Sequence, residues 1–175
     1  MNKERLVRIA LTTLSLNPKL YNCDPQSFLA ALFQSAQLGL EPGILGQSYL
    51  VPFHNSKKGI HEVQFIIGYQ GYIDLFYRSG QVTSVVAREV RENDHFKYSF
   101  GTRDDVFEHT PAKTERGALE QLYGLARLTN GDHILHVMNM EEIYERRARS
   151  RAKDSGPWVS DAAAMARKTV IRAMV

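Results

Sequence analysis

Apolar and polar positions repeat with two different periods along this chain, and the changes between them mark helices and strands. Apolar residues recur every three or four positions near both ends, as on one face of a helix, and every second position in much of the middle, as in strands. The helical spacing predicts helices over 2–16, 25–38, 70–78, 140–151 and 161–175. The alternating spacing predicts strands over 49–53, 61–67, 82–90, 96–100, 119–129 and 133–138, with a mostly acidic loop over 103–116.

Residues at the ends of these segments agree with the periodicity. Pro18 ends the first helix, and Asp24 is placed to cap the second helix, which begins with a proline. Asn139 is placed to cap the helix that follows the last strand, and Asn130-Gly131-Asp132 is a strong hairpin turn signal. Helices at both ends with hairpins between them predict an α+β fold, in which a mainly antiparallel sheet with a projecting β-hairpin is packed with helices.

The segment VQFIIGYQGYIDLFYRSG, residues 63–80, predicts a sharp corner between a strand and a helix. Gly68 breaks the strand, and Gly68 and Gly71 allow another backbone or a ligand to approach closely. The corner gathers Tyr69, Gln70, Tyr72, Phe76, Tyr77 and Arg78. Such a group suits either a packed turn with core tyrosines or a single nucleic-acid strand with exposed bases, and the residues by themselves leave both readings open.

Composition narrows the class of protein. A chain of 175 residues with 43% apolar and 23% charged residues is expected to form one soluble domain, residues 1–175. No apolar run is long enough to span a membrane, and the single Cys23 excludes an internal disulfide, which favours a reducing cytoplasm. The net charge is +3, and the first and last thirds of the chain are basic whereas the middle is acidic. This distribution allows a basic face for a polyanion.

Residue order carries a family resemblance. GYQGYIDLFYRSG closely resembles the signature of the RecT family of phage single-strand DNA annealing proteins. Four further blocks agree with that family in the same order, and they are QLGLEPG (37–43), YLVPF (49–53), AREVRENDHFKYSFG (87–101) and GPWVSDAAAMARKTVIR (156–172). The resemblance covers nearly the whole chain, because it runs from about Leu6 to the last residue.

The resemblance implies a function. It implies ATP-independent binding of single-stranded DNA and annealing of complementary strands, through an annealed duplex intermediate, in phage-type homologous recombination. It also implies a homo-oligomer, as a ring or helical filament, and a partner exonuclease in the cytoplasm of a bacterial host or in a prophage context. The expected protein is not an enzyme, has no cofactor or metal, and does not enter a membrane.

Candidate DNA contacts follow from the cations and aromatics. Arg146 to Lys153 holds five cations in eight residues without an acid. Glu142 and Glu145 are placed to pair with Arg146 and Arg149, so Arg147, Arg151 and Lys153 are expected to be free for phosphates, and the alternative is a solvated helix end. Lys168 and Arg172 lie four residues apart on one helical stripe, and Trp158 is either a core residue or a stacking platform. The full candidate set is Lys57, Lys58, Tyr69, Gln70, Tyr72, Arg78, Arg88, Arg91, Arg147, Arg151, Lys153, Trp158, Lys168 and Arg172. Glu89 and Glu92 are placed to neutralise Arg88 and Arg91 locally.

Two departures from the family pattern affect this set. Gln70 stands where a basic residue is frequent in the family, and Ala173 stands where many members have a second arginine. The chain also stops without a cap after the final helical pattern, where the family continues, so we expect that helix to be truncated.

Other functional classes receive less support. No GxxxxGK[ST] loop is present, which argues against an ATP-driven motor. Asp104, Asp105, Glu108 and His109 resemble a nuclease metal cluster, but a solvated acidic loop explains them more simply. The main alternative is an oligomeric interaction module that recruits a partner exonuclease and binds DNA weakly itself.

Overall fold

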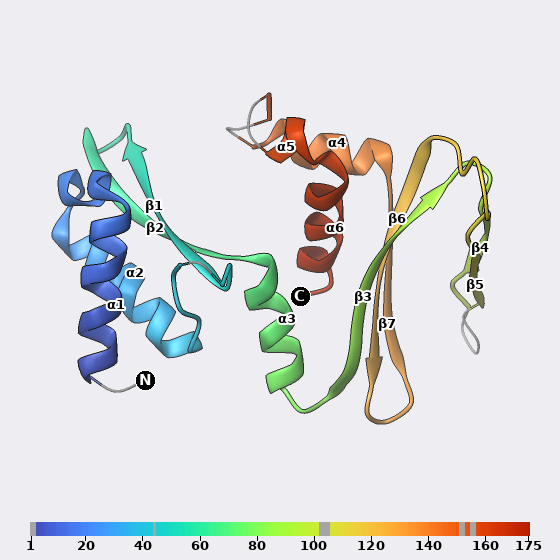
Figure 1. The fold of residues 1–175 in the computed structure, drawn as a ribbon, viewed down its shortest axis with the longest axis horizontal. Helices are drawn as coiled ribbons and strands as arrows, with labels where there is room; N and C mark the ends of the chain where they lie inside the picture. Colours follow the sequence, from blue (N-terminus) through green and yellow to red (C-terminus); the bar gives the residue numbers. More distant parts are fainter. Residues whose placement is uncertain (1–2, 44, 102–105, 151–152, 155–156) are drawn as a thin grey trace. The chain divides into compact units, whose positions relative to one another are not determined.

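The chain forms two compact units, Met1–Arg78 and Ser79–Val175 (Figure 1). The structure is a computed structural model that describes residues 3–43, 45–101, 106–150, 153–154 and 157–175. Each unit combines helices with an antiparallel sheet, which confirms the predicted α+β class. Among the described residues, no helix is both long and apolar enough to cross a membrane.

The described part of unit 1 contains three α-helices, one 3-10 helix and one hairpin. Its elements are α1 (Lys3–Leu16), the 3-10 helix η1 (Pro18–Asn22), α2 (Pro25–Leu38), β1 (Ser48–Asn55), β2 (Ile60–Ile67) and α3 (Tyr69–Arg78). Asp24 caps α2 by accepting the Ser27 N–H at 2.8 Å, and Gly39 ends it in a left-handed conformation with φ of 63°. Helix α2 packs against β2, and the core between them is built from Leu20, Cys23, Ala31, Leu50 and Val63.

Unit 2 is built around a three-stranded antiparallel sheet in the order β3-β6-β7. Its elements are β3 (Val82–Arg91), β4 (His95–Ser99), β5 (Val106–Thr110), β6 (Leu119–Leu128), β7 (His133–Asn139), α4 (Met140–Ala148), α5 (Pro157–Ser160) and α6 (Ala162–Ala173). Helix α6 lies on one face of this sheet, so close that a Cβ added to Gly124 would lie 2.9 Å from Val170 Cγ1. Leu122 and Val170 belong to the core between sheet and helices.

The opposite face of this sheet, which we call the outer face, carries the separate β4–β5 hairpin (Figure 1). Side chains alternate between faces along a strand. Tyr123 therefore points away from α6, whereas its neighbours Leu122 and Gly124 point toward it. The Tyr123 ring contacts Phe107 of the hairpin, with ring centroids 4.8 Å apart. Unit 2 thus has helix, sheet and hairpin in three successive layers.

One predicted segment is wrong in part. The loop expected over 103–116 contains β5, which pairs with β4 from Ser99↔Val106 to His95↔Thr110. Its outward Glu108 gives the segment a polar character, whereas its inward Phe107 and His109 pack against Tyr123. The short helices η1 and α5 were not predicted either. The remaining helices and strands lie within a few residues of their predicted bounds.

Candidate nucleic-acid interface

Backbone atoms of a neighbouring segment occupy the space next to the glycines of the strand-to-helix corner. A Cβ on Gly68 would lie 1.9 Å from the Gly46 carbonyl oxygen, and one on Gly71 would lie 2.1 Å from that of Gln47. The Gly68 N–H also donates to the Gln47 carbonyl at 2.9 Å. Of the two close approaches that the sequence allows, the structure shows the backbone one. Beside these glycines, Tyr69 and Tyr72 are half-buried and Gln70 is exposed.

Two candidate cations of unit 1 form hydrogen bonds and ion pairs with other residues of the same unit. The Arg78 guanidinium donates to the Leu38 carbonyl at 2.7 Å, where α2 ends, and its Nε lies 3.0 Å from Asp74 Oδ2. Lys58 Nζ lies 2.7 Å from Glu62 Oε1, and this hydrogen bond raises the pKa of Lys58. Lys57, at the tip of the β1–β2 hairpin, is exposed and its ammonium group has no partner among the described residues.

The basic segment after α4 is less available than the sequence suggested. Arg147 Nε donates to the Lys153 carbonyl at 2.8 Å, and Arg147 Nη2 lies 3.9 Å from Asp154 Oδ1. The expectation that Arg147 is free for phosphates is therefore wrong for this conformation. Lys153 is exposed, and Arg151 lies outside the described residues.

Lys168 and Arg172 share one side of α6. Ala166 and Val170 face the sheet core, and residues two positions further along a helix point to roughly the opposite side. Arg172 is exposed and Lys168 is half-buried. Burial lowers the pKa of Lys168, and the positive charge of Arg172 lowers it further. The two cations are therefore close enough to form one positive stripe.

The cations of β3 lie on different sides of the sheet. Arg91 Nη2 lies 2.9 Å from Glu89 Oε2, and Arg167 of α6 pairs with the other oxygen of the same carboxylate. Local neutralisation by Glu89 is therefore confirmed for Arg91. Arg88 is exposed on the outer face, opposite Glu89 in the strand alternation, and its guanidinium has no partner among the described residues.

Trp158 is a core residue in this structure. Its side chain is 6% exposed and packs in the cluster that contains Leu122, Met138, Ile143 and Val170. Of the two readings that the sequence left open, the geometry favours the core one, because an indole buried to this degree presents no face to a nucleobase.

A buried ionic network on the outer side of unit 2 escaped the sequence analysis. The fully buried Asp94 carboxylate accepts hydrogen bonds from Arg116 Nε at 3.0 Å, Arg116 Nη2 at 2.6 Å and the Ala112 N–H at 2.9 Å. His109 Nε2 lies 3.2 Å from Asp94, and its Nδ1 lies 3.1 Å from the Tyr123 hydroxyl. The Arg116 guanidinium holds the pKa of Asp94 well below its usual range. This network fastens the β4–β5 hairpin to the sheet, and the only sequence signal for it is an aspartate inside the block 87–101.

The acidic residues that resemble a nuclease metal cluster are described only in part. No group of three or more His, Cys, Asp or Glu side chains suited to a metal occurs in the described ranges. Glu108 is exposed, whereas its neighbour His109 points inward to Asp94. Asp104 and Asp105 lie outside the described residues.

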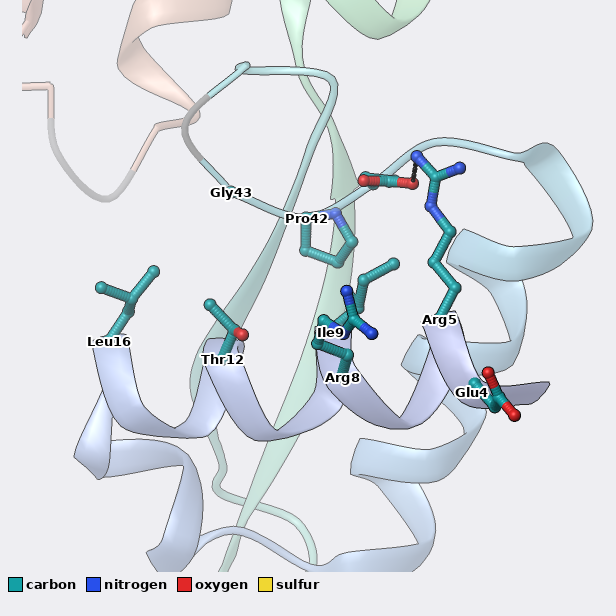
Figure 2. A pocket seen from close by; sticks show the side chains of 9 residues that line it. Glu4, Arg5, Arg8, Ile9, Thr12, Leu16, Pro42 and Gly43 are labelled. Carbon is teal, nitrogen blue, oxygen red and sulfur yellow. Dashed lines mark ion pairs between the residues drawn. The ribbon is translucent and has the colours of Figure 1, made fainter. Parts of the chain in front are cut away.

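A hollow of unit 1 lies between α1 and the segment 41–43 and has a volume of about 640 Å³ (Figure 2). Arg5 and Arg8 project from α1 into it, but Glu4 and Glu41 also line it. Arg5 forms an ion pair with Glu41, as Figure 2 shows. Because the lining does not concentrate one sign of charge, this hollow is a poor match for a polyanion.

Unit 2 presents exposed cations on a helix and a sheet, and unit 1 presents aromatic side chains at a glycine corner. Each of these features is typical of proteins that bind the backbone of a nucleic acid. The chain belongs to the RecT family, because the RecT family model matches residues 4–175, which confirms the resemblance. It is 46% identical over 175 residues to Protein RecT of Escherichia coli (strain K12), covering 98% of this chain and 65% of that protein. It is 27% identical to the uncharacterized protein YqaK of Bacillus subtilis (strain 168), covering 98% of this chain and 59% of that protein. The chain thus spans about two thirds or less of these curated relatives.

Proposed function

We propose that this chain binds single-stranded DNA and anneals complementary strands without nucleotide hydrolysis, as a step in homologous recombination. Membership in the RecT family carries the proposal. The structure supports it through the stripe of Lys168 and Arg172, which presents two cations four residues apart on a rigid helix.

The mechanism that we propose is electrostatic. Cations neutralise the phosphates of one strand and release its counterions, which gives affinity without sequence preference. The strand is held with its bases accessible, so that Watson–Crick pairing with a second strand supplies the specificity. No residue is required to form or break a covalent bond, so the protein acts as a binding protein and not as an enzyme.

The candidate residues differ in how readily they reach a phosphate. The best placed are those without an ionic partner among the described residues, namely Lys57, Arg88, Lys153, Lys168 and Arg172. Lys58, Arg78, Arg91 and Arg147 first have to exchange a protein partner for a phosphate. At the corner, we assign sugar or base packing to Tyr69 and Tyr72 and a hydrogen bond to Gln70.

An annealing protein has to keep a long strand in register, and repeated subunits achieve this. We therefore include in the proposal a homo-oligomer, as a ring or helical filament, and a partner exonuclease that generates the single strand. A bacterial cytoplasm is the compartment in which these partners would meet.

Replacing Lys168 and Arg172 together by alanine tests the proposed stripe. The slope of log K against log salt for an oligo(dT) strand should fall by about 1.4, because each phosphate contact on single strands contributes about 0.7. The matched control is Lys3→Ala with Lys19→Ala, which removes the same charge from exposed positions of unit 1. A folded Lys168/Arg172 variant with an unchanged slope would exclude the stripe as a phosphate site.

A further inference from the structure

We propose that the outer face of unit 2 is a second contact for single-stranded DNA, where aromatic rings stack on bases and two arginines hold the adjacent phosphates. The inference rests on the proposed function and adds a site to it. The site lies on the side of the sheet opposite α6, so a strand held by Lys168 and Arg172 does not cover it.

The charge of the outer face is positive. Arg88 pairs in register with Tyr123, and Arg127 lies four residues after Tyr123, so both arginines point to the outer face. Both are exposed, and neither guanidinium has a hydrogen bond or ion pair to a described residue. Glu89, the strand neighbour of Arg88, points to the α6 side, where it pairs with Arg167. Two unneutralised arginines on a sheet are a complementary surface for phosphates.

Aromatic rings continue from the sheet along the β4–β5 hairpin. Phe96 is stacked on Tyr123 with centroids 5.9 Å apart, Tyr98 follows Phe96 at 5.3 Å, and Phe100 follows Tyr98 at 5.7 Å. Exposure rises along the row, from 7% for Tyr123 to 40% for Tyr98 and 61% for Phe100. Packing explains the inner rings, but it does not explain two large rings left open to solvent at the end of the row. Exposed rings beside arginines suit nucleobases.

A hollow of about 410 Å³ has both Arg127 and Phe107, the ring that contacts Tyr123, in its lining. Phe107 and Leu125 supply an apolar lining, Arg127 lies beside them, and Asp132 and His133 of the β6–β7 turn complete the rim. This volume is within the range of small-ligand sites. The Asp132 carboxylate repels a phosphate but accepts hydrogen bonds from base N–H groups. The hollow is therefore suited to a base, with the phosphates lying toward Arg88 and Arg127.

The same observations favour a single strand over other polyanions. A duplex keeps its bases stacked inside and offers no free face to Tyr98, Phe100 or Phe107. An acidic peptide would use the arginines but would leave the aromatic row without a role. A single strand uses both sets of side chains, because its bases and phosphates alternate along the backbone.

Two double variants test the site through different observables. Arg88→Gln with Arg127→Gln should lower the salt slope of oligo(dT) binding by about 1.4. Tyr98→Ala with Phe100→Ala should weaken binding at least about fivefold, the lower limit for one stacked base, and should leave the slope unchanged. Lys3→Gln with Lys19→Gln is the charge control, and Tyr21→Ala, which removes a 67% exposed ring in unit 1, is the aromatic control. Photocrosslinking to an oligonucleotide with 5-iododeoxyuridine should label peptides that contain Tyr98 or Phe107.

The outcomes separate this inference from the proposed function. If the wild-type protein fails to bind oligo(dT), the proposed function itself fails. If it binds, and both outer-face variants match their controls while crosslinks fall only elsewhere, the second contact is overturned and the proposed function stands. If the arginine variant loses binding of an acidic peptide but keeps its DNA affinity and slope, the face is a peptide site and the inference is equally overturned.

Discussion

Asp94 is one of the residues that connect the β4–β5 hairpin to the rest of unit 2. Its side chain is fully buried and is held by Arg116, two backbone N–H groups and His109. Asp94→Asn removes the charge that balances the partly exposed Arg116, and losing hydrogen bonds to a charged group typically costs about 1.5–3 kcal/mol. We expect the free energy of unfolding, measured with urea at pH 7, to fall by about that amount. Glu108→Gln, at a 60% exposed carboxylate on the same hairpin, is the control and should change little.

The pH dependence of this effect has a definite sign. The pKa of Asp94 is lowered in the folded state, so its contribution to stability is present above the unfolded-state pKa of about 3.9 and is lost as the pH falls below it. The difference in stability between wild type and Asp94→Asn should therefore be constant near neutral pH and should shrink below about pH 4. A difference that grows on acidification would contradict the assignment.

The close contact at Gly71 leads to a second prediction about a single residue, the effect of Gly71→Ala on stability. A Cβ at this position would lie 2.1 Å from the Gln47 carbonyl oxygen, a backbone atom that cannot swing away. Gly71→Ala should destabilise the protein by at least about 2 kcal/mol, as overpacking of a rigid site does. Gly80→Ala meets nothing within 4 Å and carries only the strain of a left-handed residue at φ of 70°, so about 1 kcal/mol is expected. Thermal unfolding of the two variants compares them, and equal effects would argue against the close backbone contact.

For single residues, the sequence predicts which positions are structurally important better than it predicts their contact partners. The glycines of the corner are recognisable because only glycine allows such an approach. The partner of Asp94 cannot be recognised in the sequence, because Arg116 lies 22 positions away and the pairing depends on where the β4–β5 hairpin folds back. In the same way, Arg147 reads as a free cation until the chain after α4 turns and brings the Lys153 carbonyl to it.

Among the single elements, helix α5 matters because it carries the buried Trp158. It has only four residues, and its Trp158 fills the core between the sheet and α6. Trp158→Ala should cost about 3–5 kcal/mol, as removal of a buried aromatic side chain does. Because this is the only tryptophan, its fluorescence should be blue-shifted, poorly quenched by acrylamide and nearly unchanged when oligo(dT) binds. Strong quenching by DNA would instead place the indole against a base.

Elements with a local signal were predicted, and those that depend on tertiary contacts were not. The Asn139 capping box and the hairpin turn at Asn130–Asp132 are encoded within a few residues, so their boundaries agree with the sequence reading. Strand β5 was missed because its inward side chains include His109, a polar residue that is buried only through its bonds to Asp94 and Tyr123. The assignment of Arg88 and Glu89 to opposite faces follows directly from strand alternation, but only once β3 is known to have helix α6 on one side.

At the scale of the whole molecule, the candidate cations do not gather into one cluster. Within unit 2, Lys168 and Arg172 lie on the far side of α6, whereas Arg88 and Arg127 lie on the outer face of the sheet. Unit 1 contributes the exposed Lys57 and the aromatic corner of α3. The small net charge of +3 does not show this arrangement, because it sums exposed cations together with cations that pair with acids, as Arg91 does with Glu89 and Arg116 does with Asp94. The exposed cations without an ionic partner among the described residues are the ones that we expect to give DNA binding its salt dependence.

Annealing of two complementary oligonucleotides tests the central claim most directly. The reaction is followed without ATP and in the presence of EDTA, first at low salt and then across a salt titration. The proposed function predicts annealing well above the spontaneous rate, with no need for nucleotide or metal, and a steep loss as salt rises. Folded, oligomeric protein that leaves annealing at the spontaneous rate would contradict it and would favour an interaction module that recruits an exonuclease.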